Sequence, residues 1–458
     1  MPSRIIENEL TELVAILSSA SAELNKFLSN RGLEKLSTEA AAPSLELTPE
    51  NVPYFQAKTS IVDAAERVVR LARGPRDTLI TLSFEHCATA SLQIALKYKL
   101  ASHIPLGGSI TYAAVSEAVG KPEVTPALVE RILQHTSSYG LFEAQPGGTV
   151  AHNAMSALLV TDPDLEAWMD LSATIAYPAG ASVPKALQSY GYSMEANESA
   201  YGVSIGRKIS QFQRFREADG QQLHDMFARA MRGIAVGGAY DLRHAVDGGY
   251  PWHLLEKDHI RLIVDVGGGP GHISMALAKK YPKLHFEVQD LPETVEVGAK
   301  SCPEELKGRV TFRPHDFMKP QPEHKVADGE GIAYFCRFIL HDWSDKYAQN
   351  ILQSLASSLR PQDRIIINDV VVPEPGQESR ERERRMQSVP PLICHSLTEL
   401  VLTSFSDRDL LMLMNLNGRE RTRTAFENLC SAVTPKLQVK TVFRPELGEL
   451  SLIDISLA

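Results

Sequence analysis

The sequence has few of the features that mark a secreted, membrane-spanning or nucleic-acid-binding protein. Its 458 residues include five scattered cysteines with no C-x-x-C pair, which argues against a disulfide framework and against a zinc site. No apolar run approaches the length of a membrane span, and the N-terminus lacks a basic region followed by an apolar one. A net charge of −9 argues against a nucleic-acid partner, because phosphate binding depends on lysine and arginine. We therefore expect a soluble cytoplasmic enzyme without a membrane or nucleic-acid partner.

One stretch, residues 262–272 (LIVDVGGGPGH), suggests a ligand site. A β-branched strand runs into a glycine turn and then a helical pattern, which lets backbone approach a ligand and directs helix N–H groups at it. The spacing does not fit the dinucleotide fingerprint, because His272 stands where the third glycine belongs, and the Gly-Lys-Ser/Thr of a phosphate loop is absent. The remaining common interpretation is the first motif of methyltransferases that use S-adenosylmethionine (SAM). A tight strand–helix connection without a ligand is the alternative.

The N-terminal third is predicted to be helical. Residues 4–28 have apolar side chains at helical spacing, residues 38–50 are of low complexity, and a second helix runs to about Arg73. Such helices either pack as a hairpin on their own domain or bury their apolar stripe against a partner subunit, and the residues leave both open.

Residues 77–155 read as three helices and a hairpin, the order of a winged helix. Thr111 and Thr125 are candidate N-caps, and residues 141–153 contain a Pro-Gly-Gly turn. The candidate recognition helix, residues 125–138, carries little charge, whereas a base-reading helix needs a cationic approach. A structural role is therefore favoured over a SAM-sensing DNA-binding regulator.

The following region, residues 156–258, is mostly helical, and its strongest apolar periodicity lies in residues 221–236. Phe227 and Met231 of that helix could line a substrate pocket or simply fill the core.

From residue 260 onward strands and helices alternate, which predicts an α/β fold with a parallel sheet covered on both faces. The last two strands look like a hairpin, so the final strand should be antiparallel. An acid–base tract at residues 378–385 is interpreted as a solvated helical face. The predicted strands are 262–266, 284–289, 309–312, 332–338, 364–371, 437–443 and 450–455, and the predicted helices are 271–281, 291–299, 346–359, 405–416 and 424–433.

Ligands of open parallel sheets bind at the carboxyl ends of the strands, so the polar residues there are the candidates. An acid about twenty residues beyond the glycine turn, as Asp290 is, can accept from a ribose diol. His341 alone could be an ordinary histidine at a strand end, but two acids predicted at the same edge favour a base whose tautomer a carboxylate fixes. The candidates along this edge are Asp265, Asp290, Asp316, Phe317, His341, Asp369 and Glu420.

Five motifs in this order resemble the caffeic-acid-type family of SAM-dependent O-methyltransferases, most closely its fungal secondary-metabolism branch. They are D-V-G-G-G-P-G-H, V-Q-D-L-P, H-D-F, L-H-D-W-S-D and N-G-R-E-R-T. The resemblance implies a Rossmann-like SAM-binding catalytic domain at 259–458 with an antiparallel last strand and a helical linker and substrate-pocket region at 156–258. It also implies an all-α dimerisation domain with a winged-helix-like module at 1–155. An intertwined homodimer is expected.

The resemblance also implies roles for individual residues. His341 would be the general base with Asp369 and Glu420 as flanking acids, although the family often has glutamate where this chain has Asp369. Met231 and Met412 fall near positions that pinch an aromatic acceptor. The predicted cofactor contacts are Gly267, Gly269 and Asp290 for the methionine and ribose of SAM, Asp316 and Phe317 for adenine, and Arg337 as a basic contact.

The expected reaction is methylation of a hydroxyl on a small aromatic or polyketide-type metabolite. A phenol has a pKa near 10, so a base must take its proton as the oxygen attacks the sulfonium methyl, and no metal is required. The alternative is a relative that has lost methyl transfer and directs dehydration or pericyclic cyclisation of a polyketide-derived substrate, because a fold is shared across functions.

Overall fold

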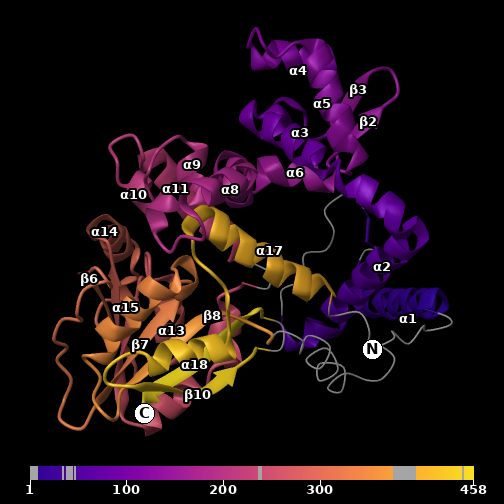
Figure 1. The fold of residues 1–458 in the computed structure, drawn as a ribbon. Helices are drawn as coiled ribbons and strands as arrows, with labels where there is room; N and C mark the ends of the chain where they lie inside the picture. The colour runs from indigo at the N-terminus through magenta and orange to yellow at the C-terminus, as the bar shows by residue number, and fades with distance from the viewer. Residues whose placement is uncertain are drawn as a thin grey trace. The chain divides into compact units, whose positions relative to one another are not determined.

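The computed structural model describes residues 9–33, 36–37, 45, 48–235, 240–374, 399–445 and 448–458 (Figure 1). They fall into two compact units, and each unit is assembled from separate segments of the chain. Unit 1 draws on residues 1–178, 215–237 and 378–404, and unit 2 draws on residues 179–214, 238–377 and 405–458. The three-part division predicted from the sequence, with boundaries after 155 and 258, stays a prediction. The acid–base tract at 378–385 and most of the low-complexity stretch at 38–50 lie outside the described residues.

Unit 1 begins with a helical hairpin, α1 (Glu9–Asn30) and α2 (Val52–Leu82). The two helices bury Leu24, Leu28, Tyr54 and Ala57 between them, so the predicted apolar stripe packs within its own unit. Part of that stripe remains exposed, because Leu10, Val14, Val69 and Leu71 are each more than 40% accessible. The α2 helix is interrupted at Gly74, whose φ of +72° ends the first helical run where the sequence analysis placed its end.

Among the described helices, none is by itself both long and apolar enough to cross a membrane. One bent pair, α2 with α3 (Glu85–Lys97), is long and apolar enough only when the two helices are counted together across the 54° bend between them.

The next part of unit 1 contains the predicted helices and hairpin. A three-stranded antiparallel sheet has the order β1-β3-β2. Both predicted N-caps are confirmed, because the hydroxyl of Thr111 accepts from the N–H of Ala114 and that of Thr125 accepts from Leu128. The helices and strands are α4 (Tyr112–Val119), α5 (Pro126–Ser138), β1 (Ser109–Thr111), β2 (Phe142–Gln145) and β3 (Thr149–His152).

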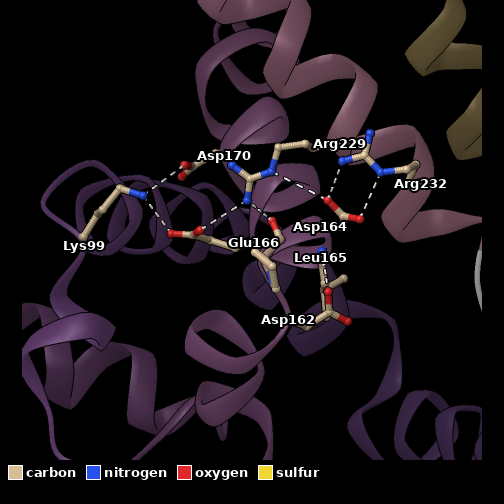
Figure 2. Close-up of polar contacts among 9 residues, drawn as sticks. Lys99, Asp162, Asp164, Leu165, Glu166, Asp170, Arg229 and Arg232 are labelled. Carbon is tan, nitrogen blue, oxygen red and sulfur yellow. Dashed lines mark hydrogen bonds and ion pairs between the residues drawn. The ribbon is translucent and has the colours of Figure 1, made fainter. Parts of the chain in front are cut away.

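Unit 1 is completed by α6 (Ala154–Thr161), α7 (Pro163–Leu171) and α11 (Gln221–Ile234), a helix that is distant in sequence from the rest of the unit. At Gly233 a Cβ would meet the backbone oxygen of Asp164 at 2.5 Å, so α11 crosses α7 at a distance only glycine permits. Figure 2 shows ion pairs at this crossing: Asp164 accepts from Nε and Nη2 of Arg232 at 3.2 and 3.0 Å. Lys99 donates to Glu166 at 2.8 Å in the same network.

Unit 2 is built on an eight-stranded sheet with the order β10-β11-β8-β7-β4-β5-β6, and β9 pairs with β8 off this path. Every predicted strand is present with ends within two residues of those expected. The pairs among β4 to β8 are parallel, and β11 is antiparallel to both β8 and β10, as predicted. The strands are β4 (Ile260–Val266), β5 (His285–Asp290), β6 (Val310–Pro314), β7 (Gly331–Arg337), β8 (Arg364–Val372), β9 (Arg421–Thr422), β10 (Leu437–Phe443) and β11 (Leu450–Leu457).

Helices cover both faces of this sheet, so its strands are nearly continuous apolar runs. One face packs against α15 and α18 and the other against α12 and α13. The hydroxyl of Thr422 accepts from the N–H of Ala425 and caps the start of α18. The described helices with residues in unit 2 include α8 (Tyr177–Tyr190), α9 (Ala200–Ser204), α10 (Gln211–Phe215), α12 (Trp252–Lys257), α13 (His272–Lys280), α14 (Pro292–Ser301), α15 (Asp345–Ala356), α17 (Glu399–Leu416) and α18 (Arg423–Ser431).

Candidate active site

The glycine turn follows β4 directly and forms a cradle without side chains. Gly267, Gly269 and Gly271 have φ values of +68°, +57° and +83°, a region that residues with a Cβ rarely adopt. The turn is fixed from the neighbouring strand, because the carbonyl of Gln289 accepts from the N–H groups of Gly267 and Gly268 at 2.8 and 3.1 Å. A Cβ at Gly268 would lie 2.5 Å from the Asp265 carboxyl group, so this glycine is also required for space.

Two carboxyl groups border the cradle. Asp290 accepts from the N–H of Gly269 at 2.8 Å through Oδ2 and from that of Leu291 at 2.7 Å through Oδ1. Asp265 is fully buried and accepts from the hydroxyl of Ser274 at 2.6 Å. Burial raises the pKa of Asp265 to about 7, and the Ser274 hydrogen bond only partly offsets it. The predicted neighbours Gly269 and Asp290 are therefore in direct contact.

The candidate adenine contacts are the next two residues of the edge. Asp316 is half-exposed and accepts from the N–H of Met318 at 3.0 Å. The ring of Phe317 meets Trp343 edge to face with centroids 6.1 Å apart, and it lies 3.5 Å from the position of a Cβ on Gly267. Phe317 thus borders the glycine cradle, and Trp343 adds a second aromatic surface that the sequence analysis did not single out.

Arg337 is partly buried at the end of β7. Its guanidinium donates to the backbone oxygen of Tyr240 at 2.6 Å and to the side chain of Asn368, and it lies 4.9 Å from the ring centroid of Phe338. Burial lowers its pKa to about 10, although the charge of Asp265 opposes the shift. These contacts tie Arg337 to its own unit, and its role as a cofactor contact stays a prediction.

His341 lies in a one-turn 3₁₀ helix, η7 (Leu340–Asp342), directly after β7. Its side chain is 10% exposed, and Nδ1 lies 3.0 Å from Oε1 of Glu420. On the other side of the ring, Nε2 lies 3.4 Å from Oδ1 of Asp342. The structure therefore brings His341 and Glu420 together across 79 residues of sequence, and it adds Asp342, which the sequence analysis quoted in a motif but gave no role.

The surrounding acids control the charge of this imidazole. Burial lowers the pKa of His341, but Asp342, Glu420 and Asp369 outweigh it and raise the pKa to about 10. Burial raises the pKa of Asp342 to about 7, against the opposing effect of His341. The imidazole and the Asp342 carboxyl group therefore titrate as a coupled pair that can hold and exchange a proton.

Asp369 is fully buried on β8 but makes no side-chain hydrogen bond, because neither of its oxygens has a partner among the described residues. Burial raises its pKa, with only a smaller lowering by His341. Asp369 influences His341 through its charge, while the imidazole hydrogen bond is made by Glu420. The short side chain, already noted in the sequence, is the physical reason for this difference.

The two candidate substrate methionines are both half-buried. Met231 lies on α11 in unit 1, where only Ala230 is fully buried on that helix. Met412 lies on α17, and its backbone oxygen accepts from the N–H of Gly418 at 3.2 Å. Their contact with an acceptor stays a prediction.

Within the described ranges, no three side chains among histidine, cysteine, aspartate and glutamate are grouped as metal ligands would be. Four of the five cysteines are described, and all four are free: Cys87, Cys302, Cys336 and Cys430.

Comparison with known proteins finds two family models. One, described as an O-methyltransferase domain, matches residues 253–434, and the other, an O-methyltransferase dimerisation domain, matches residues 80–162. The "O-methyltransferase CTB2" of Cercospora beticola is 64% identical over 457 residues, covering 100% of this chain and 95% of that protein. The "O-methyltransferase elcB" of Phaeosphaeria nodorum is 53% identical, covering 98% of this chain and 94% of that protein.

The chain belongs to the O-methyltransferase family. This confirms the family predicted from the five sequence motifs. Among solved structures, that of LepI in complex with SAM is 21% identical, has a TM-score of 0.67, and covers 88% of this chain and 94% of that one. At this identity the similarity shows a common fold, so the roles of individual residues in this O-methyltransferase rest on the geometry above.

Proposed function

We propose that this O-methyltransferase transfers a methyl group from SAM to a hydroxyl of a small aromatic or polyketide-type acceptor, with His341 as the general base. The observation that carries the proposal is the buried imidazole between Glu420 on Nδ1 and Asp342 near Nε2. A carboxylate on Nδ1 fixes the tautomer and stabilises the cation formed when the ring takes a proton.

The residues around the glycine turn fit SAM. The glycine cradle leaves space at Gly269, where nothing lies within 4 Å of an added Cβ, and Asp290 adjoins it with a carboxylate that can accept from a ribose diol. Gly267, Gly269 and Asp290 would hold the methionine and ribose parts. Asp316 with Phe317 would face the adenine, and Arg337 would add positive charge. When bound, SAM supplies a sulfonium methyl, whose bond to sulfur breaks with the electron pair passing to the sulfur.

The chain's own groups provide the proton acceptor for the hydroxyl. As the acceptor oxygen forms its bond to the methyl carbon, its proton passes to Nε2 of His341. The carboxyl group of Asp342, 3.4 Å from Nε2, can take up the proton that Nε2 holds at rest, which leaves the imidazole neutral and able to accept. This release is needed because the ionised neighbouring acids raise the pKa of His341 to about 10, so the resting imidazole holds a proton at neutral pH.

Two further expectations accompany the activity. The match of residues 80–162 to a dimerisation domain supports a homodimer. The four described cysteines are free thiols, which supports a cytoplasmic location.

The test is incubation of the purified protein with methyl-labelled SAM and a panel of phenols and hydroxylated polyketide-type aromatics. We expect label in an O-methyl product, and we expect His341→Gln to reduce the rate by roughly 10²- to 10⁴-fold, the range typical of general base catalysis. The matched control is His285→Gln, because His285 is exposed at the start of β5.

Two outcomes would count against the proposal. Equal rates for wild type and His341→Gln would remove His341 from the reaction. A cyclised or dehydrated product without transferred label would replace methyl transfer with the pericyclic alternative.

A further inference from the structure

The turn that carries His341 is held by a single buried arginine, Arg421, to which no role has been assigned. Its side chain has no exposed surface. Nη1 donates to the backbone oxygen of Leu340 at 2.7 Å, and Nη2 donates to that of Trp343 at 2.7 Å. These two carbonyls lie on either side of His341 and Asp342 in the sequence, so one planar guanidinium closes the turn that presents both side chains.

The third nitrogen of this guanidinium is anchored to the helix that follows the turn. Nε donates to Oδ1 of Asp345 at 2.9 Å, and the other oxygen of Asp345 accepts from Arg419 at 3.1 Å. Asp345 is the first residue of α15, so Arg421 links the turn, the start of α15 and its own strand β9. A lysine ammonium has three donors at a single point and cannot match this fork geometry.

The segment before Arg421 packs equally closely on the turn. The N–H of Arg419 donates to the backbone oxygen of His341 at 3.0 Å. A Cβ at Gly418 would overlap that same oxygen, so only glycine allows this approach. Glu420 lies between these contacts, which means that the residue bonded to Nδ1 and the residue holding the turn belong to one short segment.

Burial of the charged Arg421 guanidinium has an energetic cost, so stability alone does not explain its position. Burial lowers the pKa of Arg421, and Asp345 offsets this. Its carboxylate partner Asp345 is 39% exposed, so the buried part of this group is the guanidinium, and two of its three nitrogens donate to the backbone of the turn. Arg421 also acts on Asp369, because its charge lowers the pKa of that carboxyl group against the larger effect of burial.

We propose that Arg421 is a positioning residue, which fixes the backbone of the 340–343 turn for proton transfer by His341 and places a positive charge near Asp369. The inference rests on the proposed methyl transfer, because it assigns Arg421 its effect through His341. Arg421 would contribute to the reaction in two ways that substitutions can separate, through the fork geometry of its guanidinium and through its positive charge.

The experiment compares Arg421→Lys, which keeps the charge and loses the fork, with Arg421→Gln, which loses both. Arg423→Lys and Arg423→Gln are the controls, because Arg423 is two residues away, about half-exposed, and forms an ion pair with Glu427 on the same helix. We expect Arg421→Lys to lower kcat by roughly 10²-fold, the effect of a displacement of about 1 Å, with SAM affinity measured by calorimetry unchanged. We expect Arg421→Gln in addition to shift the limb of the kcat profile that His341 governs, whereas Arg421→Lys, which keeps the charge, should leave this limb in place.

A second readout does not depend on turnover. Proton NMR titration of His341, assigned by the loss of its signal in His341→Gln, should show an altered titration in Arg421→Gln and the wild-type titration in both Arg423 variants. Wild-type kcat in a folded Arg421→Lys, or an unchanged His341 titration in Arg421→Gln, would overturn the inference. Absence of methyl transfer in the wild type would instead defeat the proposed function, and the titration would still decide the role of Arg421.

Discussion

Replacement of Glu420 by glutamine tests the electrostatic account of the site most directly. The change keeps the shape of the side chain and an oxygen that can accept from Nδ1 of His341, which lies 3.0 Å from the present carboxylate. It removes one negative charge from a buried position. Because His341 owes its raised pKa partly to that charge, the variant should lower the pKa of His341.

The size of the shift follows from the contact distance. Two unit charges about 4 Å apart interact by about 4 kcal/mol at an effective dielectric constant of 20, and about 1.4 kcal/mol corresponds to one pKa unit. The expected change is therefore about 3 units, which takes the pKa of His341 from about 10 to about 7. No allowance for solvent screening is needed, because the side chain of Glu420 is 1% exposed.

The assay is the pH dependence of kcat with labelled SAM, from about pH 5 to about pH 10.5, together with the NMR titration of His341. In Glu420→Gln the limb of the profile governed by His341 should move down by about 3 pH units. The rate above that limb should fall by up to roughly 10²-fold, because a weaker base takes the proton of a phenol less favourably. Glu427→Gln, at a half-exposed position on α18, is the control. A limb that stays at the wild-type pH in Glu420→Gln would refute the claim that the charge of Glu420 raises the pKa of His341.

Three further substitutions test the structure elsewhere. The raised pKa of Asp369 means that the folded state favours its protonated form, so wild-type stability should fall as pH rises from about 4 toward that pKa. In thermal melts over this pH window, Asp369→Asn should lose less stability than the wild type, and an equal loss of stability in both would contradict the raised pKa. Gly268→Ala should destabilise the protein by about 1–3 kcal/mol and weaken SAM binding in calorimetry, because its Cβ would meet a buried carboxyl group at 2.5 Å. The control Gly308→Ala should leave SAM binding unchanged, because nothing lies within 4 Å of a Cβ at that position. Asp164→Asn should lower the free energy of unfolding, measured by chemical denaturation, by under about 1 kcal/mol, since its ion pairs are partly exposed. Gly233→Ala should lower it more, because its Cβ would meet backbone at 2.5 Å, and the reverse order would show that charge rather than close packing holds α11.

Much of the catalytic fold could be predicted from the sequence because its signals are local. Apart from β9, the strands of unit 2 are short apolar runs bounded by turn residues, and the sequence places all seven of them. The caps by Thr111 and Thr125 depend on residues three positions apart and were likewise predictable. The two-residue strand β9 was missed, because so short a strand has no periodicity of its own.

The assembly of unit 1 could not be predicted in the same way. The helix α11 is separated from the rest of that unit by a long stretch belonging to unit 2, and its docking on α7 depends on Gly233 and on ion pairs with Asp164. Neither feature marks a partner in the sequence, because a lone glycine and a surface charge are each compatible with many neighbours.

The sequence by itself determined the order of strands and helices and the residue types along one sheet edge, because these depend on neighbours in the chain and on the rule that parallel strands present their carboxyl ends together. Only the tertiary structure decided which acid hydrogen-bonds His341, because that depends on side-chain reach: Glu420 spans the gap and the shorter Asp369 does not. It alone also revealed Arg421 behind the turn, since contacts between residues about 80 positions apart leave no pattern in the chain. The approach of Asp342 to Nε2 likewise depends on the conformation of the turn, although the two residues are neighbours in the sequence.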